Sequence, residues 1–373
     1  MEANTIKPKP DNNVVSWFAK GLGRILVSIF VPVLTFLVLW QGFLFLRDTH
    51  APQIVLVIVA IIWGVGGVAL LFTVSNWVIE QLPGAWSRAL LPFVFVGPAL
   101  AILAWFLAIP TFRTLYYSFM DANSFNFIGL TNYVYAFTNQ IMLEAFRNNL
   151  LWLVFGTSFS VGAGLLIAVL ADRSRFESVY KALIFMPMAI SFVGAGVIWK
   201  FIYTYKGTGS GIQEIGLLNA IVLALGGASQ PWLQLAPWNN FLLIIIMVWL
   251  QTGYAMVILS SAIKGVPADL MEAARIDGAS EIQAFFRIIV PYIQGTLITV
   301  GTTILIFSLK LFDIVRVMTG GNSGTNVIAN EFYLERFTFG DAGRASAIAV
   351  VLLVAVIPVM IYNLRQFRES KAF

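Results

Sequence analysis

Eight apolar stretches, each about as long as a bilayer is thick, run through this chain of 373 residues. A helix needs about 20 mostly apolar residues to cross the hydrocarbon core of a membrane, and lipid cannot satisfy the backbone groups of an irregular segment. The sequence therefore predicts an all-α, polytopic membrane helix bundle with about eight transmembrane helices. The predicted spans are residues 25–46, 53–75, 90–111, 150–171, 182–204, 240–262, 290–312 and 345–364.

The composition supports a membrane protein and excludes several kinds of chemistry. Charged residues make up 11% of the chain, whereas a soluble domain carries about 25%. The chain has no cysteine and a single histidine, His50, so we predict no catalytic residue, no metal site and no bound cofactor in it. The net charge of +5 does not call for a nucleic-acid partner, because basic residues beside membrane spans give the same excess.

Lysine and arginine are shared unevenly between the two sets of connecting segments. Fourteen of them lie in the set that includes both termini, and seven lie in the other set. Because basic residues accumulate on the cytoplasmic side, we expect both termini of this multi-pass protein in the cytoplasm. The outer face then carries residues 112–149, 205–239 and 313–344, whose aromatic and amide side chains suit either protein docking or anchoring at the lipid headgroups.

The first two predicted spans differ from the rest. They are joined by a short turn around His50, and Gly64 and Gly67 allow close helix packing. We interpret them as a peripheral hairpin beside a six-span functional core. The predicted domains are a cytoplasmic N-terminal segment, the hairpin, the core and a cytoplasmic tail, at residues 1–24, 25–89, 90–364 and 365–373.

The cytoplasmic segment 263–289, between the sixth and seventh spans, has a pattern typical of two short surface helices. Pro267 suits the first turn of a helix, and Gly278 can end it with a positive φ. Ser280 and Gln283 have the spacing of a capping box for a second helix. We expect that second helix to continue into the span after Pro291.

This pair of helices has two possible roles. The small side chains of Ala273 and Ala274 would let another surface approach closely, and Glu272 and Asp277 could pair with basic groups there. Alternatively, the helices lie at the membrane interface and pack only on the bundle. The residues by themselves favour neither interpretation.

A resemblance separates the two interpretations. Glu272-Ala273-Ala274, Asp277-Gly278-Ala279 and the Phe286 region through Ile289-Val290-Pro291 resemble the EAA loop of binding-protein-dependent ABC importer permeases. In that family the loop is the coupling helix seated in a cleft of the ATP-binding subunit. The resemblance implies that the residues coupling this chain to an ATPase are Glu272, Ala273, Ala274, Asp277, Gly278, Ala279 and Phe286.

The resemblance covers residue 90 to the C-terminus and extends to the substrate class. Residues 128–133, 185–187 and 198–199 are similar to motifs of carbohydrate permeases. The implied protein has the type I ABC importer permease fold, lies in the bacterial inner membrane and is the larger subunit of a heterodimer in the maltose and α-glucoside group. The large outer domain of the maltose permease has no counterpart in residues 112–149, which puts maltose itself in doubt.

The same resemblance implies partners and an energy source. No G-x-x-x-x-G-K-[ST] phosphate loop occurs in the chain, and the glycine-rich residues 207–211 suit a flexible turn. The implied partners are a second permease subunit, two ATP-binding subunits that hold ATP and Mg²⁺, and an extracytoplasmic sugar-binding protein. An ion-coupled secondary transporter and a membrane enzyme are the alternatives. They would need buried carboxylates, broken-helix repeats or acidic clusters, which the sequence does not indicate.

Polar residues inside two spans indicate a substrate path, because such groups are costly in lipid. Two sets of three residues each share one helix face. Through the resemblance they fall on positions that line the sugar site of the maltose permease: Leu250, Gln251 and Tyr254 on the sixth span, and Phe307, Ser308 and Leu311 on the seventh. Helix–helix hydrogen bonds and core or lipid packing are the alternative roles. Lys310 is expected to reach the headgroups or to pair with Asp313.

Overall fold

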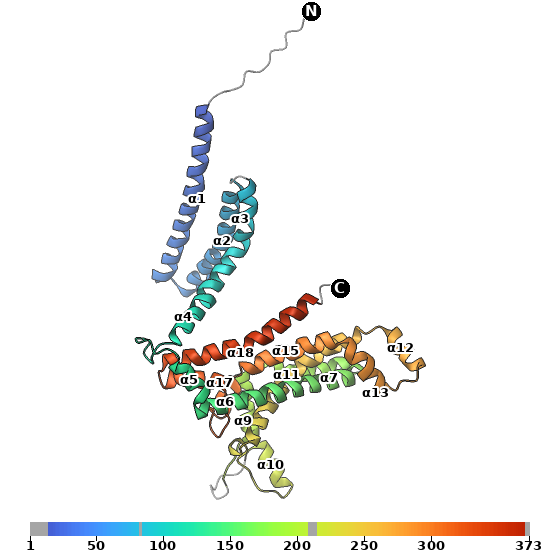
Figure 1. The fold of residues 1–373 in the computed structure, drawn as a ribbon. Helices are drawn as coiled ribbons and strands as arrows, with labels where there is room; N and C mark the ends of the chain where they lie inside the picture. The colour runs from blue at the N-terminus through green and yellow to red at the C-terminus, as the bar shows by residue number, and fades with distance from the viewer. Residues whose placement is uncertain (1–13, 82–83, 208–214, 370–373) are drawn as a thin grey trace, which may run out of the picture. The chain divides into compact units, whose positions relative to one another are not determined.

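The computed structural model describes residues 14–81, 84–207 and 215–369 (Figure 1). The predicted terminal segments and the glycine-rich turn therefore lie partly outside the described residues. The chain divides into two compact units, Met1–Thr111 and Phe112–Phe373.

The first unit contains the predicted hairpin and the third predicted span. Helices α1 (Val14–Asp48) and α2 (Gln53–Glu80) are joined by the short turn at His50. They pack where Trp63 Nε1 donates a hydrogen bond to the carbonyl of Leu39 at 3.1 Å and Gly67 lies against the Leu39 side chain. Helix α3 (Gly84–Leu103) packs on α2. The compact unit thus ends later than the predicted hairpin, and the functional division at residue 90 stays a prediction.

The second unit is a bundle of helices joined by surface segments. Helix α11 (Trp238–Lys264) runs through its centre and contains more buried residues than any other described helix. It crosses α7 (Thr157–Asp172) at Gly164, where a Cβ atom would lie 2.4 Å from Ala255 Cβ. Such close approach of two helices is how membrane bundles gain packing energy without a hydrophobic driving force.

The remaining helices belong to the second unit, except that α4 spans the division at Thr111. In chain order the helices outside the loop are α4 (Ile109–Tyr117), α5 (Thr131–Thr138), α6 (Gln140–Leu151), α8 (Glu177–Phe185), α9 (Phe192–Tyr203), α10 (Leu217–Ala224), α15 (Gln294–Leu309), α16 (Asp313–Met318), α17 (Ile328–Tyr333) and α18 (Ala342–Glu369). Short π-helical segments interrupt several of them, at Ala104–Ala108, Trp152–Gly156, Phe285–Ile289 and Leu334–Thr338. Within the described residues the strand-like pairing is limited to an isolated bridge between Met120 and Phe127.

Six continuous helices are long and apolar enough to cross a membrane, and two further spans are bent. The predicted span 182–204 is a pair, Glu177–Ala189 and Phe192–Tyr203, that meets at 102°. The predicted span 290–312 belongs to a second pair, Glu281–Tyr292 and Gln294–Leu309, that meets at 71°. With each pair counted as one span the described residues hold eight, as predicted. The bend in each of these two spans was not predicted from the sequence.

Each bend lies close to a proline. The first member of the first pair ends in a 3₁₀ turn, Met186–Ala189, that contains Pro187. Ser191 then caps the second member by accepting a hydrogen bond from the Gly194 amide at 3.0 Å. The second pair breaks at Ile293, two residues after Pro291. Proline has no amide hydrogen and clashes with the preceding turn, so it weakens a helix where packing favours a change of direction.

Candidate functional site: the coupling loop and the substrate path

The loop after α11 has the predicted helix–turn–helix geometry. Helix α12 (Ala268–Ile276) ends at Gly278, whose φ is +75°. The Ala279 amide donates to the Ala274 carbonyl at 2.9 Å and the Gly278 amide to the Arg275 carbonyl at 3.1 Å. This pair of hydrogen bonds closes the helix end around a left-handed residue that glycine adopts without strain.

Helix α13 (Glu281–Ala284) begins with the predicted capping box. Ser280 Oγ accepts a hydrogen bond from the Gln283 amide, and Gln283 Oε1 accepts one from the Ser280 amide at 2.8 Å. The chain then continues through a π-helical turn and α14 (Val290–Tyr292) to the bend at Ile293. Figure 1 shows α12 and α13 at one end of the bundle, away from α5 and α17.

The predicted coupling residues differ in exposure. Glu272, Ala273, Asp277 and Gly278 are exposed, Ala279 is half-buried and Phe286 is 64% exposed. Glu272 and Asp277 make no ion pair within the described part of the chain. Ala274 is buried against its own chain. The coupling role of all seven residues stays a prediction.

Apolar side chains beside these residues are also left uncovered. Ile276 is 85% exposed and Ile282 is 72% exposed, although both lie in a loop outside the long spans. Large apolar side chains gathered on a polar loop mark a surface for contact with another protein or with a membrane.

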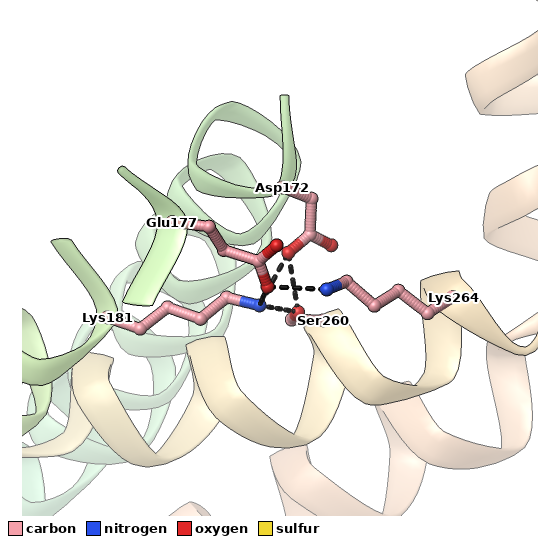
Figure 2. A network of polar contacts seen from close by, with 5 residues as sticks. All are labelled: Asp172, Glu177, Lys181, Ser260 and Lys264. Carbon is pink, nitrogen blue, oxygen red and sulfur yellow. Dashed lines mark hydrogen bonds and ion pairs between the residues drawn. The ribbon is translucent and has the colours of Figure 1, made fainter. Parts of the chain in front are cut away.

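A second group of charged residues lies next to the loop, and the sequence analysis missed it. Figure 2 shows Asp172 from the end of α7, Glu177 and Lys181 from α8, and Ser260 and Lys264 from the end of α11. Lys181 Nζ lies 2.5 Å from both Asp172 Oδ1 and Glu177 Oε1, and Lys264 Nζ lies 2.5 Å from Glu177 Oε1. The four-residue spacing of Glu177 and Lys181 was the signal that could have found it.

The predicted substrate residues do not share one environment. Leu250, Gln251 and Leu311 are buried, and Ser308 is fully buried with no hydrogen-bond partner for its hydroxyl among the described residues. Tyr254 is half-buried and Phe307 is 45% exposed. In this chain, therefore, Tyr254 and Phe307 are the members of the set whose side chains a ligand can best reach. Their contact with a substrate stays a prediction.

Lys310 lies beside an aromatic ring, and its expected reach to the headgroups stays a prediction. Its ammonium nitrogen lies 5.9 Å from the centroid of the Phe307 ring. It forms no ion pair with Asp313 in the described structure. A cation held near an aromatic face is weakly stabilised by the ring electrons.

The three predicted outer segments meet at the end of the bundle opposite the loop, where asparagine side chains join them. Asn239 Nδ2 donates to the Ser323 carbonyl at 2.7 Å, and Asn148 and Asn240 both donate to the Gly324 carbonyl, at 2.9 and 3.0 Å. These bonds tie α6 and the start of α11 to the segment that follows α16. Hydrogen-bonded networks of buried amides hold loops in one conformation.

A buried carboxylate network completes this end of the bundle. The Tyr135 hydroxyl donates to Glu335 Oε1 at 2.7 Å, and Arg344 lies with its guanidinium carbon 4.3 Å from the Tyr135 ring centroid. Arg344 is a weak partner for Glu335, at 3.8 Å. Burial raises the pKa of Glu335 above its ordinary value of 4.5, while the hydrogen bond from Tyr135 and the charge of Arg344 act in the opposite direction.

This shift predicts a dependence of stability on pH. A carboxyl group with a raised folded-state pKa stabilises the fold below about pH 4.5, and that contribution is lost as the pH rises through the folded-state value. Glu335→Gln keeps an acceptor for Tyr135 without a charge. We expect its melting temperature, followed by tryptophan fluorescence, to fall less than that of the wild type between pH 4.5 and neutrality. Parallel curves for the two proteins would contradict the assignment.

A bundle of bilayer-length helices, with a loop at one end whose apolar side chains are uncovered, suits a membrane transport subunit. Residues 160–369, more than half of the chain, match the family described as binding-protein-dependent transport system inner membrane component. The chain therefore belongs to the permease family of binding-protein-dependent ABC importers.

Relatives of known name agree with this family. The osmoprotective compounds uptake permease protein GgtC of Synechocystis sp. is 57% identical over 278 residues, which are 74% of this chain and 99% of that protein. The α-glucoside transport system permease protein AglF of Rhizobium meliloti is 48% identical over 286 residues, 76% of this chain and 84% of that protein.

The fold has a counterpart among solved structures. A subunit of a bacterial ABC transporter involved in the import of the acidic polysaccharide alginate superposes with a TM-score of 0.65 at 19% identity, over 75% of this chain and 96% of that one. The bent helices would by themselves have suited an ion-coupled secondary transporter. The family match leaves that alternative without support.

Proposed function

We propose that this chain is the larger membrane subunit of an ABC importer that carries a small α-glucoside, such as a disaccharide or a glucosyl-polyol, into the cell. The observation that carries the proposal is the 57% identity to GgtC over 99% of that protein. GgtC is named for osmoprotective compounds and AglF for α-glucosides. One substrate class satisfies both names if the osmoprotectant is a glucosylated small molecule.

The motor of this importer lies in other chains. The sequence holds no phosphate loop, so two ATP-binding subunits supply ATP, Mg²⁺ and the hydrolysis step, and this chain has no ATPase site of its own. The exposed face of α12 and α13, with Glu272, Ile276 and Ile282, docks on one of them. A second permease subunit completes the membrane part as a heterodimer.

The orientation follows from the basic residues. The termini and the coupling loop face the cytoplasm, because the segments that contain them carry most of the lysine and arginine. The opposite end of the bundle, where residues 112–149, 205–239 and 313–344 meet, faces outward. There the extracytoplasmic sugar-binding protein docks and releases its ligand.

Transport couples two conformations to ATP binding and hydrolysis. Closure of the ATP-binding pair moves the coupling loop, and this movement opens the membrane cavity outward to accept the sugar. Hydrolysis returns the cavity to the cytoplasmic side. Tyr254 and Phe307 contact the sugar first, and Gln251 and Ser308 contribute hydrogen bonds when the helices separate. Ligand and nucleotide thereby bias one two-state element.

A panel of sugars tests this proposal. The complex is reconstituted with its binding protein, and ATPase activity is measured with sucrose, trehalose, maltose, a glucosyl-glycerol and, as matched controls, a β-glucoside and free glycerol. We expect stimulation by one or more α-glucosides and none by the controls. Equal activity with every compound, or stimulation by the controls alone, would contradict an α-glucoside importer.

A further inference from the structure

The charged group shown in Figure 2 fastens the start of α8 to the ends of two other helices. Besides the ion pairs of Lys181 and Lys264, Ser260 Oγ donates to Asp172 Oδ1 at 2.7 Å and accepts a hydrogen bond from Lys181. The two carboxylates and two ammonium groups balance in charge. The side chains of Asp172 and Lys181 are 12% and 19% exposed, so their attraction is screened less than that of a surface pair. Glu177 and Lys264, at the edge of the group, are 30% and 51% exposed, so solvent screens their attraction more.

This group lies directly beside the coupling loop. Lys264 is the last residue of α11, and α12 begins four residues later at Ala268. On the other limb of the loop, Glu281 of α13 pairs with Arg173, which follows Asp172 in the chain, at 2.8 Å. Both limbs of the loop are therefore tied to the short turn between α7 and α8.

The far end of α8 reaches the predicted substrate path. A Cβ atom on Gly253 would lie 2.6 Å from the Ile184 carbonyl oxygen and 2.7 Å from Phe185 Cα. The backbone of the last turn of α8 thus rests on α11 between Gln251 and Tyr254. A movement of α8 against α11 would therefore displace Gln251 and Tyr254 directly.

We propose that Glu177 and Lys264 are positioning residues for energy coupling: their ion pair makes α8 move with the coupling loop and transmits that movement to α11 at Gly253. This inference rests on the proposed function, in which the loop receives force from an ATP-binding subunit. α8 then provides a second route for the movement, in addition to the route through α11 and α15, the helices that precede and follow the loop in the chain. The charged group joins α8 to the loop, and α8 contacts α11 at Gly253.

Charge reversal and charge exchange test the inference in the reconstituted complex. Lys264→Glu places two carboxylates together, and we expect it to lower uptake per ATP hydrolysed by about tenfold. The double variant Glu177→Lys with Lys264→Glu restores the attraction, while Asp172 still pairs Lys181, and is expected to recover most of the coupling. Arg175→Glu is the matched control, because Arg175 is exposed in the same turn and forms no ion pair in the described structure.

The melting temperature of each complex distinguishes a role of the ion pair in coupling from a role in stability alone. The inference predicts that Lys264→Glu assembles with a melting temperature close to wild type and loses coupling. It is overturned if the variant couples normally, if the exchange variant does not recover, or if coupling falls only in proportion to lost folded protein. Sugar-stimulated ATPase activity of the wild type is read in the same assay, so a failure of the proposed function itself is seen independently of these variants.

Discussion

Glu272→Lys is expected to abolish sugar uptake while the chain still inserts and folds. Glu272 is exposed in the middle of α12 and has no ion-pair partner in the described residues, so the substitution costs the isolated subunit little. In the proposed complex it places a lysine where we expect the carboxylate to meet a basic surface of the ATP-binding subunit. Truncating one member of a buried charge pair costs about 2–5 kcal/mol. Uptake into proteoliposomes and co-purification of the ATP-binding subunits measure the two consequences.

Two further variants sharpen this experiment. Glu272→Gln removes the charge and keeps the size, and it should retain part of the activity. Glu80→Lys makes the same charge reversal at the exposed end of α2 and should leave uptake unchanged. Normal uptake by Glu272→Lys would show that this carboxylate has no part in coupling.

Tyr254→Ala is expected to weaken sugar-dependent uptake by about tenfold or more, which corresponds to ~1.4 kcal/mol of lost contact energy. Tyr254 is half-buried and reachable, in contrast to its neighbours Leu250 and Gln251. Its ring offers a flat apolar face to a sugar, and its hydroxyl offers a hydrogen bond. The concentration of binding protein loaded with sugar that gives half-maximal uptake is the quantity to measure.

The conservative variant distinguishes the two contributions of Tyr254. Tyr254→Phe keeps the ring and should lose less than the alanine variant if stacking dominates. Val257→Ala, one turn further along the same helix, serves as a packing control because it removes apolar volume without a polar or aromatic contact. If Tyr254→Ala behaved like this control, the residue would be a packing residue and the substrate path would lie elsewhere.

Local chemistry was predicted well where a few neighbouring residues determine the structure. The end of α12 at Gly278 and the start of α13 at Ser280 and Gln283 depend on backbone geometry and hydrogen bonds within one turn. The positions of the spans depend on summed hydropathy, which the lipid environment makes decisive. Both kinds of information lie within a short window of sequence.

Features that depend on distant neighbours were not predicted. Four prolines lie inside three described helices, α1, α3 and α18, without a comparable break. Pro187 and Pro291 therefore did not by themselves predict bends of 102° and 71°. Ser308 and Ala274 are buried because other helices pack against them, and the sequence near each residue does not specify those helices. In a chain this apolar, the helix face that packs on protein and the helix face that contacts lipid have similar residue compositions.

The charged group around Glu177 shows the same limitation. Asp172 and Ser260 are 88 residues apart in the chain, and only the crossing of α7 and α11 brings them together. Lys181 and Lys264 belong to the fourteen basic residues that indicate the cytoplasmic side. Their second role as partners of Asp172 and Glu177 needed the three-dimensional arrangement.

The most direct test of the account is the location and partner of the coupling loop. Ile276→Cys gives a single thiol in a chain without cysteine, at a side chain that is 85% exposed. We predict that a membrane-impermeant maleimide labels it in inside-out vesicles and not in right-side-out ones, and that assembly with the ATP-binding subunits protects it. Labelling from the outer side, or equal labelling with and without those subunits, would contradict a cytoplasmic loop driven by a separate motor.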